Sequence, residues 1–285
     1  MIARKLVDGP IASFGGVIMK LLPNLLITSL LTFLSFETAA QQATTSPSTS
    51  ANQSPQRDPQ ALAILQGAFA AMGGSVPSDS TANGTVTTVA GSRTETGSVT
   101  ILTRGTNQAC EQIQTPHGFT LVYSKGQASQ VIDSVTTPLS SELASSSRSV
   151  AFPVPLIAAV LNNPDYGFVY LGLESLNGLE VHHLQYWNSF NSQPKFQFLA
   201  PLTLTDIWID TASGLPQRVS QIQRAGRGSE PRIQLDTYLS NYQKVGGVLY
   251  PFLIQKSLNG SPWMTFSIAS VSFNTGLTDA NFPVQ

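Results

Sequence analysis

Charged side chains are scarce in this sequence. Asp, Glu, Lys and Arg make up 11% of the 285 residues, and the formal net charge is −1. Residues 1–40 hold three of the 15 basic and two of the 16 acidic residues, so the remainder has a net charge of about −2. Binding to nucleic acid or to an anionic membrane surface requires clustered Lys and Arg. The composition therefore argues against both kinds of partner.

Cysteine is almost absent. Cys110 is the only one, so no disulfide can form within the chain and no metal site can be built from cysteines. A lone cysteine in a strand is typical of a small buried hydrophobic residue, which is the interpretation that we favour. A disulfide between two copies of the chain is the alternative.

The residues that usually carry catalysis are also few. The chain has three histidines, and two of them, His182 and His183, are adjacent in a predicted strand and therefore point to opposite faces. Asp206 and Asp210 lie about 13 Å apart at a strand rise of about 3.3 Å per residue, too far for a carboxylate pair. No G-x-S-x-G motif is present. We therefore predict no catalytic residue, no metal site and no cofactor.

The N-terminal region has the pattern of an export signal. Lys20 precedes an apolar run, LLPNLLITSLLTFLSF, and small residues end at Ala40. This pattern predicts a signal peptide over 1–40, with Met19 as an alternative start, and a periplasmic or secreted protein. A permanent membrane anchor is the alternative, and no cysteine follows the cleavage site to carry a lipid. Residues 41–57 are rich in Ser, Thr, Gln and Pro and predict a disordered linker, which leaves 58–285 as a single domain.

The predicted domain begins with a helix. Asp58 can cap the free amides of the first turn, and Pro59 is tolerated at the first helical position. Apolar residues follow at a spacing of three or four and form one face, namely Leu62, Leu65, Phe69 and Met72. Gly73 and Gly74 end the helix.

Antiparallel strands follow the helix. They are predicted from short runs of β-branched and aromatic residues between turn residues. The first group is 84–90, 97–104, 109–114, 119–124 and 127–132. An Asn-Gly turn at 177–178 predicts a hairpin of 167–174 with 180–187. The last group is 204–210, 217–224, 232–242, 248–257 and 264–274.

Two connecting segments differ from the strands. Residues 134–149 are serine-rich and predicted to be mobile, and Pro155 then opens a short amphipathic helix that ends before Pro164. Together they are predicted to form either a lid or a fixed helix that plugs the core. Residues 190–199 are rich in aromatic side chains and predict a loop or an irregular strand.

The predicted fold is mainly β, a wide curled antiparallel sheet that forms a half-barrel of about eleven strands. Two or more helices cover its concave face. So few helices leave an apolar cavity in a sheet that curls. Candidate ligand-binding residues are the apolar residues expected on this face, namely Ile101, Phe119, Leu121, Leu156, Ile157, Val160, Ile233, Leu235, Phe252, Ile254, Phe266 and Ile268. Trp208, Trp263 and Phe273 are expected in or near the same apolar face.

The C-terminal third carries turn motifs in a distinctive order. They are Trp208-Ile209-Asp210 with Gly214-Leu215-Pro216, then Gly246-Gly247 with Tyr250-Pro251, then Asp279 with Phe282. In this order and spacing they resemble the periplasmic lipoprotein-carrier superfamily (LolA/LolB/LppX-like), as a divergent member. The resemblance implies a half-barrel with helices in its mouth and an apolar ligand site.

Together these observations predict a periplasmic carrier. It would hold a lipid, a lipoprotein acyl chain or another hydrophobic ligand non-covalently, as a monomer. The alternative is an envelope sensor or adaptor that uses the same half-barrel to bind a membrane protein or lipoprotein partner. A hydrolase is the least favoured class.

Overall fold

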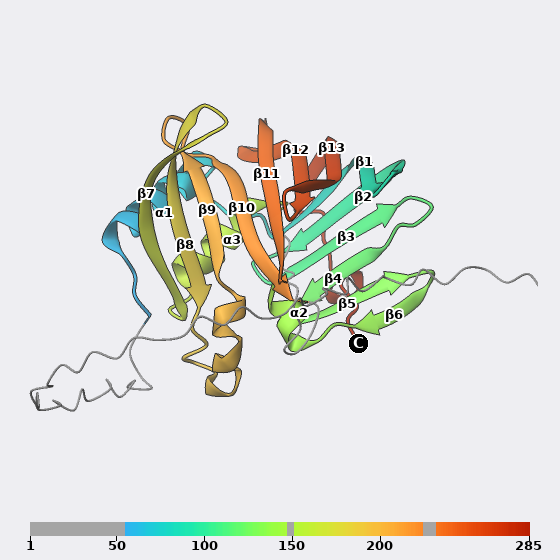
Figure 1. Ribbon diagram of the computed structural model, residues 1–285, viewed down its shortest axis with the longest axis horizontal. Helices are drawn as coiled ribbons and strands as arrows, with labels where there is room; N and C mark the ends of the chain where they lie inside the picture. Colours follow the sequence, from blue (N-terminus) through green and yellow to red (C-terminus); the bar gives the residue numbers. More distant parts are fainter. Residues whose placement is uncertain (1–54, 147–150, 225–231) are drawn as a thin grey trace, which may run out of the picture. The chain divides into compact units, whose positions relative to one another are not determined.

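The structure, a computed structural model, describes residues 55–146, 151–224 and 232–285. These residues form thirteen strands and a few helices (Figure 1). The predicted signal peptide and most of the predicted linker lie outside the described residues. The strands are β1 (Asp79–Ala90), β2 (Arg93–Arg104), β3 (Gln108–Gln114), β4 (Thr120–Ser124), β5 (Gln127–Ile132), β6 (Val135–Pro138), β7 (Tyr166–Leu176), β8 (Leu179–Asn188), β9 (Thr205–Asp210), β10 (Pro216–Arg224), β11 (Arg232–Val245), β12 (Val248–Leu258) and β13 (Ser261–Phe273).

All thirteen strands form one antiparallel sheet. Its spatial order is β6-β5-β4-β3-β2-β1-β13-β12-β11-β10-β9-β8-β7. Consecutive strands pair with each other except β6 and β7, and β1 also pairs with β13. The sheet is curled. It does not close into a barrel, because its two edge strands, β6 and β7, do not pair with each other. The predicted fold class is confirmed, with thirteen strands in place of about eleven.

The connection between the two edges positions two helices. Since β6 and β7 follow one another in sequence but lie at opposite edges, the chain between them must cross the sheet. The crossing contains α2 (Ser141–Ser146) and α3 (Pro153–Asn162). All residues of α3 from Pro153 to Val160 are buried, so α3 is a core helix and not an exposed lid. It begins two residues before the predicted start.

The serine-rich segment is more ordered than predicted. Residues Val135–Pro138 form the edge strand β6, and Ser141–Ser146 form α2. Asp133 and Ser134 both have positive φ, 48° and 65°, and make a tight turn that folds β6 back onto β5. An edge strand needs no apolar alternation, which explains why composition failed to indicate it. The predicted mobile residues 147–149 lie outside the described residues.

The N-terminal helix forms as predicted. It is α1 (Pro59–Ala71), and the Asp58 carboxylate accepts hydrogen bonds from the amides of Gln60 (2.8 Å) and Ala61 (3.0 Å). Helix α1 packs against α3 and β7, as Figure 1 shows. The ordered chain starts before the helix, since the Gln56 carbonyl accepts a hydrogen bond from the Phe168 amide (2.8 Å). Residues 56 and 57, assigned to the linker by composition, therefore belong to the fold.

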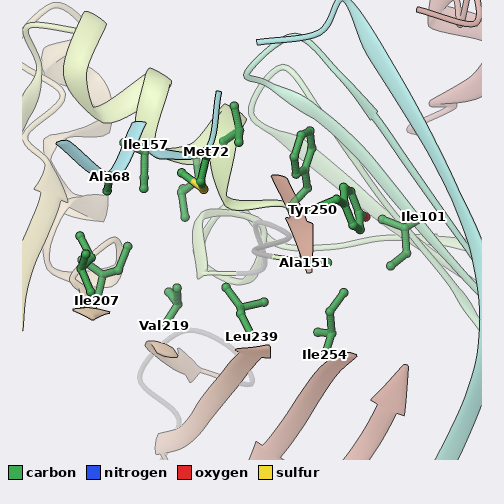
Figure 2. Packing of buried hydrophobic residues seen from close by; sticks show 14 of the residues in the cluster. Ala68, Met72, Ile101, Ala151, Ile157, Ile207, Val219, Leu239, Tyr250 and Ile254 are labelled. Carbon is green, nitrogen blue, oxygen red and sulfur yellow. The ribbon is translucent and has the colours of Figure 1, made fainter. Parts of the chain in front are cut away.

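The main core lies between the two helices and one face of the sheet. In Figure 2, Ile207, Val219, Leu239 and Ile254 point from successive strands toward α1 and α3. The helices contribute side chains such as Met72 and Ile157, which are 0% and 1% exposed. Because this face is covered by helices and encloses the core, it is the concave face of the curled sheet.

An ion pair across the concave face demonstrates the curl. Glu111 lies on β3 and Lys256 on β12, four strands apart in the sheet, which is about 19 Å in a flat sheet at about 4.8 Å per strand. Their charged groups are nevertheless 2.5 Å apart, and both side chains are buried. The sheet must therefore bend strongly between them. A bulge at Asn83/Gly84 lies in this region, and a Cβ on Gly84 would be 2.2 Å from the Ser267 carbonyl oxygen.

A smaller core lies on the convex face. It contains Leu102, Cys110, Val122 and Phe282. The free Cys110 is 1% exposed, as predicted for a buried small hydrophobic residue. Burial raises the pKa of its thiol to about 12. The C-terminal segment that supplies Phe282 is held by Asp79, whose carboxylate accepts hydrogen bonds from the amides of residues 275–277.

Two further predictions need correction. Trp208 does not join the main core: it lies on the convex face between the imidazole of His183 (ring centroids 4.3 Å apart) and the guanidinium of Arg218. Its neighbours Ile207 and Ile209 point into the core, and strand alternation sends Trp208 the other way. Residues 194–202 form a 3-10 helix, η1 (Pro194–Leu202), where a loop or irregular strand was predicted.

Candidate ligand cavity

A cavity of about 790 Å³ opens at one end of the concave face. Its lining comes from four parts of the chain: the turns beside β4, the helices α2 and α3, the segment through η1, and the ends of β7 to β10. The lining residues include Tyr123, Lys125, Leu156, Ala158, Ala159, Asn162, Tyr186, Asn188, Phe190, Phe196, Leu199, Thr205 and Gln221. The crossing connection thus forms one side of the cavity and the sheet forms its floor.

Two walls of the cavity present apolar side chains beside polar ones such as Asn162 and Gln193. Helix α3 contributes Leu156, Ala158 and Ala159, and the small alanine side chains leave space in front of the helix. The opposite wall is η1 with the residues just before it. Because side chains three residues apart eclipse in a 3-10 helix, Phe196 and Leu199 form one stripe toward the cavity. These walls can contact a hydrocarbon chain or ring.

The floor of the cavity is polar. Tyr186, Thr205 and Gln221 stand side by side on β8, β9 and β10, since Tyr186 pairs with Thr205 and Thr205 with Gln221. Thr205 is 2% and Gln221 7% exposed. One step further along the same strands lie Leu184, Ile207 and Val219, all in the main core. The concave face therefore changes from apolar to hydrogen-bonding where the cavity begins.

Only one charged residue lines the cavity among the described residues, and it is already paired. Lys125 Nζ lies 2.8 Å from a carboxylate oxygen of Asp279. Hydrogen bonds from Lys125 and Gln108 lower the pKa of Asp279, so the carboxylate stays ionised beside the lysine. Asp279 also accepts a hydrogen bond from Arg104 (2.6 Å), so these three side chains together carry one net positive charge beside the cavity.

Asp165 fixes one lip of the cavity. It is 6% exposed, and its carboxylate accepts hydrogen bonds from the amide (3.0 Å) and the hydroxyl of Ser192. Its carbonyl oxygen accepts from the Ser189 amide and hydroxyl, both at 2.8 Å. These bonds join the segment before η1 to the end of α3, so the two apolar walls are held at a set distance.

Arg57 holds the C-terminal end of α3. Its guanidinium donates to the carbonyl oxygens of Leu161 (2.8 Å) and Asn163 (3.2 Å), and it lies 4.6 Å from the ring centroid of Phe168. The last carbonyls of a helix have no partner within the helix, and here an arginine from the N-terminal segment supplies one. Sequence reasoning missed Arg57 because it precedes the first predicted element.

The predicted ligand-binding residues lie mostly in the core beside the cavity. Leu156 lines the cavity itself. Six residues belong to the buried main core, namely Ile101, Ile157, Val160, Ile254, Phe266 and Ile268, and Phe119 and Phe252 pack against it. Leu121 and Ile233 are half-buried, and the buried Leu235 pairs with Gln221 next to the cavity floor. The polar floor residues carried no signal that distinguishes them from the many other Thr and Gln residues of the chain.

The histidines and acidic residues do not assemble into a common site. His182 contacts the Tyr170 hydroxyl (3.2 Å), whereas His183 on the other face lies between Glu174 (2.7 Å) and Asp206 (3.0 Å). The two adjacent histidines thus point to opposite faces, as predicted. The described residues contain no group of three His, Cys, Asp or Glu side chains arranged for a metal ion. They also contain no helix long and apolar enough to cross a membrane.

Solved structures are similar to this chain. An outer membrane lipoprotein-sorting protein domain from Vibrio parahaemolyticus matches with a TM-score of 0.53 and 14% identity, over 78% of this chain and 95% of that one. A LolA superfamily protein from Nitrosomonas europaea matches with a TM-score of 0.49 and 17% identity, over 78% and 96%. No family model and no curated protein sequence matches the chain. At these identities the comparison shows the fold alone: the chain has the fold of the Vibrio parahaemolyticus domain, and the half-barrel implied by the C-terminal motifs is confirmed.

Proposed function

We propose that this protein binds a hydrophobic or amphipathic small molecule non-covalently in the cavity and carries it within the cell envelope. The observation that supports this most is the cavity itself, about 790 Å³ with apolar side chains from α3 and η1 in its lining. Pockets of roughly 300–1,000 Å³ are typical of small-molecule sites. The LolA-like fold agrees with the proposal, because a protein of this fold is described as a lipoprotein-sorting domain.

The proposed binding requires no reaction and no cofactor. Burying apolar surface stabilises the complex by about 0.8 kcal/mol per methylene group, so a long acyl chain would bind well by contact with the walls alone. Residues 1–40 would direct the protein to the periplasm or out of the cell, and cleavage near Ala40 would release it. The carrier would act as a monomer.

A chain-length series tests the proposal. Titration with monoacylglycerols of increasing chain length should show tighter binding with each added methylene, by up to about fourfold per group, until the cavity is full. Protein stripped of bound lipid by organic extraction and refolding provides the reference. Affinity that is independent of chain length would contradict the proposal, since contact with the walls would then contribute nothing.

The edge strand β7 supports a second candidate function, a sensor or adaptor. Among the described residues β7 pairs only with β8 and, at one bridge, with Arg57. It exposes Leu171 and Leu173, at 50% and 55%. An extended segment of an envelope protein could add to this edge. Pull-down of such a partner from detergent extracts by wild type, and its loss in Leu173→Lys, would favour this function; equal capture by both would oppose it.

A further inference from the structure

Gln221 has an unsatisfied amide in the floor of the cavity. Gln221 is only 7% exposed, and its Oε1 has no hydrogen-bond partner among the described residues. Its Nε2 makes one long hydrogen bond, 3.4 Å to Thr205 Oγ1. Exchanging the two amide atoms would leave the same deficit, because only one of them has a neighbour to bond. Buried polar groups are nearly always paired, so this amide indicates a missing partner.

The place of Gln221 indicates where that partner lies. Val219, two residues earlier on the same face of β10, belongs to the closed main core. Gln221 follows at the point where the face reaches the cavity, next to Thr205 and within the same lining as Asn188 on β8. The amide and hydroxyl groups can both donate and accept hydrogen bonds. They form a polar platform opposite the apolar walls of α3 and η1.

The charges of the site restrict the partner further. No Asp, Glu, Arg or His from the described residues lines the cavity, and Lys125 is paired with Asp279 at 2.8 Å. Among the described residues no ionised side chain hydrogen-bonds to Gln221 or Thr205, so a charged group placed on these two residues would lose its hydration without a counter-ion beside it, which is strongly unfavourable. A neutral group with hydroxyl, ester or amide functions would lose its hydration but gain the hydrogen bonds of the platform.

We infer that the ligand is an uncharged amphiphile. Its polar group hydrogen-bonds to Gln221 and Thr205, and its apolar body contacts α3 and η1. This inference rests on the proposed function and names its ligand class: monoacylglycerols, alkyl glycosides and related neutral lipids bind in preference to fatty acids and cationic amphiphiles.

A set of probes with one alkyl chain and different head groups tests the inference. Dodecanoyl glycerol and dodecyl maltoside are neutral, dodecanoate is anionic, and dodecyltrimethylammonium is cationic. Binding is measured by calorimetry below the concentration at which each probe forms micelles. Both neutral probes should bind at least about tenfold more tightly than either charged probe, since only the charged head groups are desolvated without compensation.

Two variants assign the preference to Gln221. Gln221→Glu keeps the shape of the side chain but replaces an amide by a charge, and it should weaken dodecanoyl glycerol binding by about tenfold or more. Gln217→Glu makes the same change on the same strand outside the cavity lining and should leave binding unchanged. Far-ultraviolet circular dichroism confirms that both variants are folded.

The outcomes separate the inference from the proposed function. Tighter binding of dodecanoate or of the ammonium probe would overturn the inference and leave the carrier function intact. Equal binding of dodecanoyl glycerol by wild type and Gln221→Glu would overturn the role of the platform, and would indicate that water satisfies the amide. Binding of none of the four probes would overturn both the inference and the proposed function.

Discussion

Removing one partner of the Glu111–Lys256 pair should strongly destabilise the protein. The two side chains are 5% and 8% exposed and meet at 2.5 Å across the concave face. Lys256 Nζ also lies 5.0 Å from the ring centroid of Phe266. Lys256→Met would leave the Glu111 carboxylate in the core without its cation. Burial raises the pKa of the nearby Tyr250, and the charge of Glu111 raises it further, which shows how close this carboxylate lies to the core.

The magnitude follows from the burial of both groups. Breaking a buried ion pair by removing one partner typically costs about 3–5 kcal/mol, whereas replacing both partners by apolar residues is often neutral. We therefore expect Lys256→Met and Glu111→Leu each to lower the free energy of unfolding by about 3–5 kcal/mol. The double variant should recover most of this loss.

Urea unfolding followed by tryptophan fluorescence measures these differences. Lys244→Met provides the control, because Lys244 lies exposed on the neighbouring strand β11 and should unfold as wild type does. Single variants that lose less than about 1 kcal/mol, the range of exposed pairs, would refute the reasoning. In that case β3 and β12 would not face each other across the concave face, and the sheet would be less curled than the 2.5 Å distance between Glu111 and Lys256 requires.

Three further predictions concern residues around the core and the cavity. Cys110 should resist iodoacetamide at pH 8 in the folded protein and react on unfolding, because burial raises its pKa to about 12; rapid native labelling would contradict its burial. Burial raises the pKa of Asp79, but hydrogen bonds from Thr275 and from the amides of residues 275–277 outweigh this and lower it below 3.8. A lowered pKa stabilises the fold above pH 3.8, and this stabilisation is lost as the pH falls through the folded value. Asp79→Asn should therefore be less stable than wild type at pH 7 and lose less stability on acidification to pH 3; parallel urea curves at both pH values would refute this. Arg57→Ala should cost about 1.5–3 kcal/mol and increase hydrogen exchange at the end of α3, and unchanged exchange there would show that Arg57 does not hold the helix.

Local signals in the sequence predicted most of the sheet. Asn177 and Gly178 have φ of 52° and 84°, as a two-residue hairpin turn requires, and such turns can be recognised from two adjacent residues. Asp58 likewise gave the start of α1. The edge strand β6 was missed because its residues, Val-Thr-Thr-Pro, lack the apolar pattern that indicates a strand.

The cavity could not be predicted in the same way. A strand pattern shows which residues point to the concave face, but it does not show where α3 covers that face and where the cavity remains. Phe266 and Ile254 are thus in the closed core, whereas Gln221 lies at the floor of the cavity. The floor combines residues from three strands and the walls come from the crossing connection. That arrangement depends on pairing register and on helix packing, which single segments do not specify.

Native mass spectrometry of gently purified protein tests the central claim most directly, with two variants for comparison. Ala159 lines the cavity, and Ala159→Trp should fill part of the space in front of α3, whereas Ala63→Trp places the same side chain on the exposed face of α1. Wild type and Ala63→Trp should retain a bound small molecule, and folded Ala159→Trp should be empty. Wild-type protein without a bound molecule, or an equal adduct on Ala159→Trp, would contradict the claim that this cavity holds the ligand.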